Sequence, residues 1–383
     1  MDGQHPGRQP ALVEMGAGIV SGGTIELVNV DKHYGDLKVV DGISASIGAG
    51  QFVSLLGPSG SGKTTTLMMV AGFVLPSAGR IVVDGSDVSR VPPRKRGFGM
   101  VFQNYSLFPH LNVFDNIAFP LRLRNVPNAE MGERVQQALD LVQLGSFGGR
   151  QISQLSGGQQ QRIALARAVV FQPRVVLMDE PMGALDKNLR FAMQTEIKEI
   201  QRRLGMTVLY VTHDQEEAMN LSDRIVIMNH GRIEQIGAPQ SVYDLPESPF
   251  VANFLGEANL FPGVVTELAG AQGVLTLDDG TSVRGPVATG VGKGSRAALF
   301  IRPERLQFAA AGSAGAPDRN AITGTVNRCS FLGSYRRYGV EIAPGLQASV
   351  DQPNTEAMAL FAPGSRVELR WPAGSGRIIG TAP

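Results

Sequence analysis

The stretch GPSGSGKTT at residues 57–65 decides the fold, because it fits the spacing Gly-x-x-x-x-Gly-Lys-Ser/Thr. The apolar run FVSLL (52–56) precedes it and predicts a strand, and GKTTTLMMVAG (62–72) follows with the character of a helix. A loop between a strand and a helix start turns backbone N–H groups and the positive end of the helix toward an anion. The stretch therefore predicts a loop that binds the phosphates of a nucleotide.

Each residue type in this loop has a physical use. Glycines let the backbone curl around the phosphates, Lys63 supplies a point charge, and Thr64 offers a hydroxyl to Mg²⁺. The nucleotide-binding residues expected here are Gly57, Pro58, Ser59, Gly60, Ser61, Gly62, Lys63, Thr64 and Thr65.

A second glycine-rich patch, LSGGQ, lies at residues 155–159. Ser156 is a plausible N-cap for the helix predicted over QQQRIALARAVV (159–170), so its hydroxyl and the Gly157, Gly158 and Gln159 region are expected to face a phosphate. Because this helix belongs to a separate helical stretch, we expect its nucleotide to sit on another subunit. ATP bound between the phosphate loop of one subunit and the LSGGQ stretch of another would join the two subunits reversibly. This arrangement is typical of an ATP-driven motor.

Two carboxylates end the apolar run VVLMDEP (175–181), which is typical of a strand buried in a parallel sheet. An ordinary strand end with exposed acids would look the same. Beside a phosphate-binding loop, the carboxyl end of such a strand favours a functional role. Asp179 is expected to hold Mg²⁺, and Glu180 to orient or deprotonate the attacking water, which typically contributes ~10²–10⁴-fold.

Three further residues are candidates for the site only because they are expected to lie near the predicted nucleotide. His213 follows the strand-like TVLYV (207–211) and could contact the γ-phosphate, although a lone histidine is more often structural. Gln103 follows GMVF (99–102), and its amide oxygen could complete the Mg²⁺ shell. Tyr34 is either a turn residue or a platform for adenine.

Composition excludes several classes of protein. A net charge of +1 gives no electrostatic footprint for nucleic acid, and the single Cys329 allows no intramolecular disulfide. No apolar stretch approaches the ~18–20 residues needed to cross a bilayer, and the N-terminus lacks the pattern of a signal peptide. We expect a cytosolic protein whose membrane role comes through partners.

The pattern along the chain predicts a flexible N-terminal tail (1–23), an α/β domain (24–242) and a β-rich region (243–383). Within the α/β domain, helical spacing at ERVQQALDLVQL (133–144) and 159–170 indicates a helical insert over about 104–170, and 187–204 reads as a long amphipathic helix. The β-rich region predicts one or two small barrels, with a flexible loop at 309–320.

Taken together, these motifs resemble the ATPase subunit of an ABC transporter over roughly residues 24–383. The matching stretches are GPSGSGKTT (Walker A), VFQNYSLFPH (Q-loop), LSGGQQQR (signature), VVLMDEP (Walker B), ALD at 184–186 (D-loop) and VTHD (H-loop). The resemblance implies an α/β P-loop NTPase fold of the ABC type, with a helical insert and an antiparallel β subdomain. It also implies that two chains pair head to tail around ATP, that Asp186 lies near the nucleotide and that Tyr34 stacks on adenine. The chain departs from many relatives at Met182–Gly183, where Leu-Ser is common.

The tail is similar to the C-terminal TOBE domain, an all-β OB-like fold, of importer ATPases. SPFVANFLGEANLFPG (248–263), IRPER (301–305) and FLGSYRRYGV (331–340) carry this likeness. It implies a homodimer on the cytoplasmic face of the membrane, two permease subunits and a solute-binding protein, with no nucleic acid partner. The subgroup serves polyamines, ferric iron and related solutes, and GEANLFPG favours polyamines.

Alternatives remain for the function and for one surface. A soluble ABC ATPase of DNA repair or translation would co-purify with DNA or ribosomes, and a nucleotide kinase would phosphorylate a nucleoside monophosphate. The aromatic stretch YSLFPHLNVF (105–114) is either a docking surface for a permease or part of the core of the helical insert.

Overall fold

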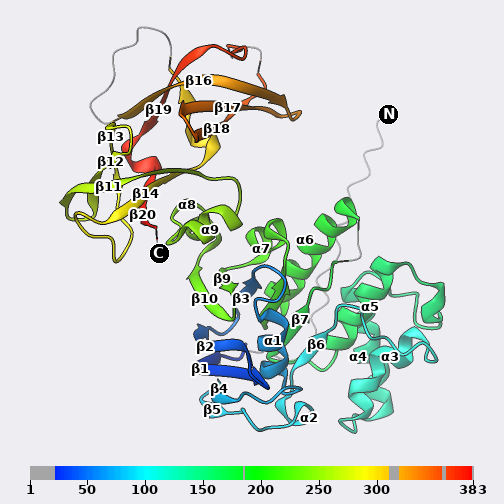
Figure 1. Ribbon diagram of the computed structural model, residues 1–383. Coiled ribbons are helices and arrows are strands. Elements are labelled where there is room, and N and C mark those ends of the chain that lie inside the picture. Colours follow the sequence, from blue (N-terminus) through cyan, green and yellow to red (C-terminus); the bar gives the residue numbers. More distant parts are fainter. Residues whose placement is uncertain (1–21, 184–185, 310–318, 356–358, 382–383) are drawn as a thin grey trace, which may run out of the picture. The chain divides into compact units, whose positions relative to one another are not determined.

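A computed structural model describes residues 22–183, 186–309, 319–355 and 359–381. The described chain forms two compact units (Figure 1): residues up to Ser54 with Gly62–Thr212, and Leu55–Ser61 with residues from His213 onward. Most of the predicted N-terminal tail and of the predicted loop at 309–320 lie outside the described residues. Among the described helices, none is both long enough and apolar enough to span a bilayer.

The first unit contains an antiparallel sheet in the order β2-β1-β4-β5. Its strands are β1 (Ile25–Tyr34), β2 (Leu37–Ile47), β4 (Ala78–Val83) and β5 (Ser86–Asp87). Inward residues such as Ile25, Leu27 and Ile81 are almost fully buried. This sheet is the antiparallel β subdomain that the sequence predicts.

A parallel sheet forms the centre of the same unit, where β3, β8, β7 and β6 follow one another in that order. Their bounds are β3 (Phe52–Leu56), β6 (Gly99–Val101), β7 (Val175–Asp179) and β8 (Thr207–Thr212). Every residue of β7 and β8 is buried, as expected for strands covered on both faces. In the parallel register Asp179 pairs with Val211, so β7 and β8 end together at one edge of the sheet.

The helices of the first unit fall into two groups. Near the sheets lie α1 (Lys63–Ala71), α2 (Pro93–Arg96) and α6 (Lys187–Leu204). The helical insert contains α3 (Val113–Arg122), α4 (Asn128–Leu141), the short 3-10 helix η1 (Ile152–Gln154) and α5 (Gly157–Val169), and Figure 1 shows α3, α4 and α5 side by side. Helix α4 begins five residues before the predicted segment 133–144 and ends three residues before its end.

The second unit begins with the residues that end β3 and form the loop after it. Helix α7 (Gln215–Leu221), the antiparallel pair β9 (Arg224–Asn229) and β10 (Arg232–Gly237), α8 (Pro239–Asp244) and α9 (Pro249–Phe254) follow His213. Leu56, Ile225, Ile227 and Val251 are buried in one cluster of this part. The hairpin between β9 and β10 turns at His230–Gly231.

Two five-stranded antiparallel sheets make up the rest of the second unit, in the orders β13-β12-β11-β14-β20 and β15-β19-β16-β17-β18. The elements are β11 (Asn259–Ala269), β12 (Gln272–Leu277), β13 (Ser282–Pro286), β14 (Arg296–Ile301), η2 (Pro303–Arg305), β15 (Gln307–Phe308), β16 (Arg319–Phe331), β17 (Tyr335–Ala343), β18 (Leu346–Pro353), β19 (Arg366–Pro372), η3 (Ala373–Ser375) and β20 (Arg377–Gly380). One core joins both sheets, with Phe261 and Leu299 from the first and Val326, Tyr338 and Trp371 from the second. The C-terminal region is therefore all-β, as predicted.

Candidate nucleotide-binding and catalytic site

The loop after β3 has the backbone of a tight phosphate cradle. A Cβ on Gly57 would lie 2.2 Å from the carbonyl oxygen of Met228, so no larger residue fits there. Gly60 has a φ of 78°, which is the left-handed region that favours glycine. The N–H of Gly231 donates to the carbonyl of Ser61 at 3.2 Å, so the β9–β10 turn supports the loop. The glycine spacing predicts the loop, but nothing in the sequence indicates this contact.

Helix α1 begins directly after this loop. Its N-cap, Gly62, adopts a φ of 95° and makes no side-chain capping hydrogen bond. A helix N-terminus carries a positive partial charge, so this end of α1 favours an anion. Lys63 is the first helical residue and is 5% exposed. Burial lowers the pKa of its ammonium group, and the charges of Glu180 and Asp179 oppose that shift.

Thr64 and Asp179 lie in contact at the end of β7. The Thr64 hydroxyl donates to Oδ1 of Asp179 at 3.1 Å, across 115 residues of sequence. Burial raises the pKa of Asp179, and the charge of Glu180 adds to the rise, whereas the Thr64 hydrogen bond and Lys63 oppose it. Two oxygen-bearing side chains thus meet beside a buried ammonium group, which is the pairing that the sequence predicted for Mg²⁺.

Glu180 follows Asp179 with an unusual backbone. Its φ is 42°, which is uncommon for a non-glycine residue, and its N–H donates to the carbonyl of Val211 at 2.9 Å. Nε2 of Gln103 lies 3.4 Å from Oε2 of Glu180 and donates to it. The structure therefore brings Gln103, which follows β6, to the same sheet edge as the two carboxylates.

His213 is the first residue after β8, and its side chain is exposed. The next residue, Asp214, caps α7 by accepting from the N–H of Glu217 at 3.2 Å. His213 thus occupies a fixed junction between a buried strand and a capped helix. Because β8 ends beside β7 in parallel register, the junction follows the strand edge at which Asp179 lies.

The LSGGQ stretch forms the N-terminus of α5 through a capping box. The Ser156 hydroxyl accepts from the N–H of Gln159 at 3.4 Å, and Oε1 of Gln159 accepts from the N–H of Ser156 at 3.0 Å. The predicted N-cap is therefore confirmed. The two glycines differ: a Cβ on Gly157 meets nothing within 4 Å, whereas one on Gly158 would lie 2.8 Å from Cδ2 of Leu189. Gly158 allows α5 to approach α6 closely, and Gly157 faces open space.

Two of the predicted residues stand apart from this group. Asp186 caps α6 by accepting from the N–H of Leu189 at 3.0 Å, and the preceding residues 184–185 lie outside the described chain. Tyr34 ends β1 and is 51% exposed, and Nζ of Lys32 lies over its ring, 4.8 Å from the centre. No hydrogen bond joins either residue to the carboxylates in the described part of the chain.

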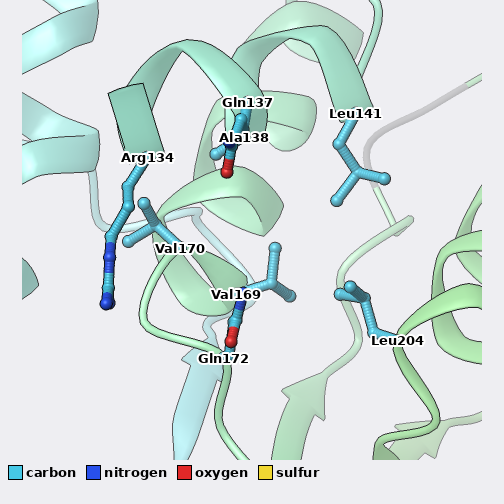
Figure 2. Close-up of a pocket in the computed structure, with 8 residues that line it drawn as sticks. All are labelled: Arg134, Gln137, Ala138, Leu141, Val169, Val170, Gln172 and Leu204. Atoms are coloured by element: carbon cyan, nitrogen blue, oxygen red, sulfur yellow. The ribbon is translucent and has the colours of Figure 1, made fainter. Parts of the chain in front are cut away.

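A separate small pocket lies in the first unit, between α4 and the ends of α5 and α6 (Figure 2). Leu141, Val169 and Leu204 line it together with polar side chains such as Arg134 and Gln172. No carboxylate, histidine or hydroxyl lines this pocket. It lacks the groups for phosphate or metal chemistry, so the sheet edge is the candidate site.

Comparison with known proteins agrees with this geometry. The family model described as ABC transporter matches residues 40–183, and the TOBE domain model matches residues 299–379. The solved structure of cbiO1 from Clostridium perfringens, part of the ABC transporter complex cbiONQ, is 28% identical and covers 57% of this chain and 89% of its own, with a TM-score of 0.53. The dimeric structure of MJ0796, a bacterial ABC transporter cassette, is 32% identical and covers 56% of this chain and 98% of its own, with a TM-score of 0.51.

Fold and site together define a P-loop ATPase of the ABC type. Among curated proteins, the spermidine/putrescine import ATP-binding protein PotA of Rubrobacter xylanophilus is 44% identical, covering 93% of this chain and 93% of the relative. The spermidine/putrescine import ATP-binding protein PotA of Trichodesmium erythraeum is 46% identical, covering 87% of this chain and 88% of the relative. The chain belongs to the ATP-binding proteins of ABC transporters and is an ATP-hydrolysing enzyme of that family. The nucleotide-kinase alternative is thereby excluded.

Proposed function

We propose that this chain energises a membrane importer by binding and hydrolysing ATP at the carboxyl edge of its parallel sheet. The Thr64–Asp179 hydrogen bond beside the buried Lys63 carries the proposal. The loop 57–65 and the N-terminus of α1 bind the phosphates, and Tyr34 stacks on the adenine. This assignment uses the anion preference of a helix N-terminus and the exposure of Tyr34.

The donor set fits Mg²⁺. Mg²⁺ prefers oxygen ligands and is commonly bound by one or two carboxylates together with substrate phosphates. Thr64, Asp179 and Gln103 supply such oxygens, and among the described residues no group of three or more His, Cys, Asp or Glu side chains forms a separate metal cage. When bound, the ion would neutralise charge on the terminal phosphates.

Glu180 is proposed as the residue that orients and deprotonates the attacking water. The amide of Gln103 donates to its carboxylate at 3.4 Å and so restrains its direction. His213 is proposed to contact the γ-phosphate from the end of β8. A restrained base at the phosphate-bearing edge lowers the barrier to hydrolysis because the water is held in position for attack.

Two copies of the chain are proposed to enclose two ATP molecules. Ser156, Gly157, Gly158 and Gln159 of one copy would face the phosphates held by the other, and Asp186 would lie near the same seam. The open space around Gly157 supports this assignment, since a phosphate can approach its backbone closely. The MJ0796 cassette, which is similar to this chain, was solved as a dimer.

The cargo and the partners follow from the relatives. Because several relatives at 42–46% identity are spermidine/putrescine import proteins, we propose polyamine uptake, with ferric iron as the alternative cargo. The chain would sit on the cytoplasmic face of the membrane and act with two permease subunits and a solute-binding protein. No nucleic acid partner is proposed, because the net charge is only +1.

The hydrolytic assignment is tested with Glu180→Gln. We expect ATP turnover to fall ~10²–10⁴-fold, while ATP binding is retained and the chains accumulate as pairs. Phosphate release measures turnover, and light scattering in Mg-ATP measures the pairing. Turnover equal to that of the unaltered chain would overturn the role of Glu180.

The cargo is tested by removing the gene from the native cell and restoring it on a plasmid. Uptake of labelled spermidine should be lost on removal and return with the unaltered chain but not with Glu180→Gln. Uptake of ferric iron in the same cells is the control. Loss of iron uptake with spermidine uptake intact would reassign the cargo.

A further inference from the structure

The turn that follows Gln103 has an unfavourable backbone. Tyr105 has a φ of 61° and Ser106 a φ of 46°, so two successive non-glycine residues occupy the left-handed region. Such residues persist only where the surrounding structure holds them in place. The N–H of Tyr105 donates to the carbonyl of Phe102 at 2.9 Å, which closes a turn around Gln103. The conformation of Tyr105 therefore sets the place of Gln103.

Arg167, from the last turns of α5, holds this backbone. Its Nη1 donates to the carbonyl of Ser106 and its Nη2 to the carbonyl of Tyr105, each at 2.8 Å. The guanidinium also lies 5.5 Å from the ring centre of Phe108. A planar fork can bind two adjacent carbonyls at once, and an ammonium group on a flexible stem cannot reproduce that geometry.

The Arg167 guanidinium has these two carbonyls as its hydrogen-bond acceptors. Burial lowers the pKa of the Arg167 guanidinium, and in the described part of the chain no carboxylate forms an ion pair with it. Its charge is compensated by the dipoles of the two strained peptides and by the Phe108 ring. For stability alone this arrangement gains little, since partly desolvating a cation that has no acidic partner costs free energy. It is well suited to fixing a backbone direction.

Helix α5 carries the glycine-rich stretch at its other end. Ser156 caps it, and Arg167 lies eleven residues further on, about 16 Å away at 1.5 Å per residue. One helix therefore carries the residues proposed to contact the ATP of the other copy and also Arg167, which binds the Tyr105–Ser106 turn. We call the two hydrogen bonds from Arg167 to this turn the clamp.

We propose that Arg167 is a positioning residue for hydrolysis: it holds the Tyr105–Ser106 turn so that Gln103 stays on Glu180, and it couples that turn to the N-terminus of α5. The proposal rests on the proposed function, because Gln103 and Glu180 have their roles there. Arg167 acts through the turn, because its hydrogen bonds go to the carbonyls of Tyr105 and Ser106.

The test compares Arg167→Lys with a matched control, Arg124→Lys. Arg124 also stacks on a ring, 3.6 Å from the centre of Phe171, and donates to a carbonyl, that of Pro120 at 3.0 Å, but it has no contact with the Gln103 turn. For Arg167→Lys we expect kcat to fall about tenfold with KM for ATP within about twofold, because positioning of the base is lost and ATP binding is not. Arg124→Lys should leave both values unchanged.

A double-mutant cycle separates positioning from general damage. In a Gln103→Ala background, Arg167→Lys should lower kcat by less than about twofold further, because the residue through which it acts is already gone. An equal fall in both backgrounds would overturn the proposal. If Arg167→Lys fails to fold, the same cycle is run with Arg167→Gln, which lacks the two-nitrogen fork that binds both carbonyls.

Hydrogen exchange gives a readout that does not need activity. Peptides covering residues 102–106 should exchange about tenfold faster in Arg167→Lys and at the original rate in Arg124→Lys. Unchanged exchange in both variants overturns the clamp. If the unaltered chain hydrolyses no ATP while exchange responds as expected, the proposed function fails and the clamp on the turn stands.

Discussion

The Thr64 hydroxyl donates to Oδ1 of Asp179 at 3.1 Å, joining the first turn of α1 to the end of β7. Lys63, the neighbour of Thr64, is buried and so is Asp179. The N-terminus of α1, the ammonium group of Lys63 and the oxygens of Thr64 and Asp179 thus belong to one region, where the chain turns from strand to helix. A nucleotide with its metal ion would replace the polar contacts that burial removes from these groups.

Removing the Thr64 hydroxyl tests the metal site. Thr64→Val keeps the shape of the side chain but deletes the proposed Mg²⁺ ligand and the hydrogen bond to Asp179. We expect the Mg²⁺ concentration for half-maximal ATP hydrolysis to rise roughly 10- to 100-fold. Thr64→Ser, which keeps the hydroxyl, should stay within about threefold of the unaltered chain. The measurement is a Mg²⁺ titration at saturating ATP, and equal curves for Val and Ser would contradict the assignment.

The raised pKa of Asp179 predicts a stability cost in the nucleotide-free protein. Burial disfavours the charged carboxylate, so the pKa of Asp179 in the folded protein lies above the usual 3.8 of an aspartate. Between the pKa of Asp179 in the unfolded chain and its higher pKa in the folded protein, the folded state binds more protons than the unfolded state. The free energy of unfolding therefore falls as pH rises through this range. Asp179→Asn should therefore unfold at a higher temperature than the unaltered chain at pH 7.5, with the gap narrowing toward pH 3.8.

Calorimetry without nucleotide measures this gap, and saturating Mg-ATP provides the control. The ligand should raise the melting temperature of the unaltered chain more than that of Asp179→Asn, because binding adds stability in proportion to affinity. A melting temperature for Asp179→Asn that is lower at pH 7.5 would show that the charge of Asp179 stabilises the fold.

Gly157 and Gly158 form a matched pair for the two-copy arrangement. A Cβ at Gly157 meets nothing within 4 Å, whereas one at Gly158 would lie 2.8 Å from Cδ2 of Leu189. We expect Gly157→Ala to keep its melting temperature and its ATP binding but to lose most ATP hydrolysis and pairing. Gly158→Ala should lower the melting temperature as well. Full activity and pairing in Gly157→Ala would contradict close approach of a second copy at this residue.

Much of this site could be predicted from sequence because its parts are local. Glycine spacing at 57–62 and the helical pattern after it specify the phosphate loop. Asp179 and Glu180 could be placed beside it because parallel strands end at a common edge, which the register of β7 and β8 confirms. The capping box at Ser156 likewise follows from residues three apart.

Other parts leave little trace in the sequence. Helix α3 was missed because Pro120 lies inside it, and proline usually ends a helix. Asn116 holds this region with hydrogen bonds to the backbone of Phe108 and Leu111, a pattern that composition cannot reveal. Arg167 binds carbonyls about sixty residues earlier in the chain, and any residue type can supply a carbonyl. Such long-range contacts to the backbone have no sequence signature.

Arg302 provides a stability test within the second unit. It is 1% exposed, and its guanidinium donates to the carbonyls of Ala252, Glu257 and Tyr243 at 2.8–3.2 Å. Arg302→Met leaves one buried carbonyl and two partly buried carbonyls without these donors, so we expect the free energy of unfolding to fall by about 3 kcal/mol. Trp371, the single tryptophan and fully buried in the same unit, reports the transition by fluorescence in urea.

The control is Arg296→Met, which removes an exposed ion pair between Arg296 and Asp278. Arg296 is the first residue of β14, and Arg302 directly follows the same strand. Exposed pairs contribute little to stability, so its unfolding midpoint should match that of the unaltered chain. If Arg302→Met unfolds at the same urea concentration as Arg296→Met, the three carbonyls have found water or other donors, and Arg302 does not hold residues 243–257 to the β-sheets. A clear separation of the two midpoints identifies Arg302 as the residue that fastens this segment.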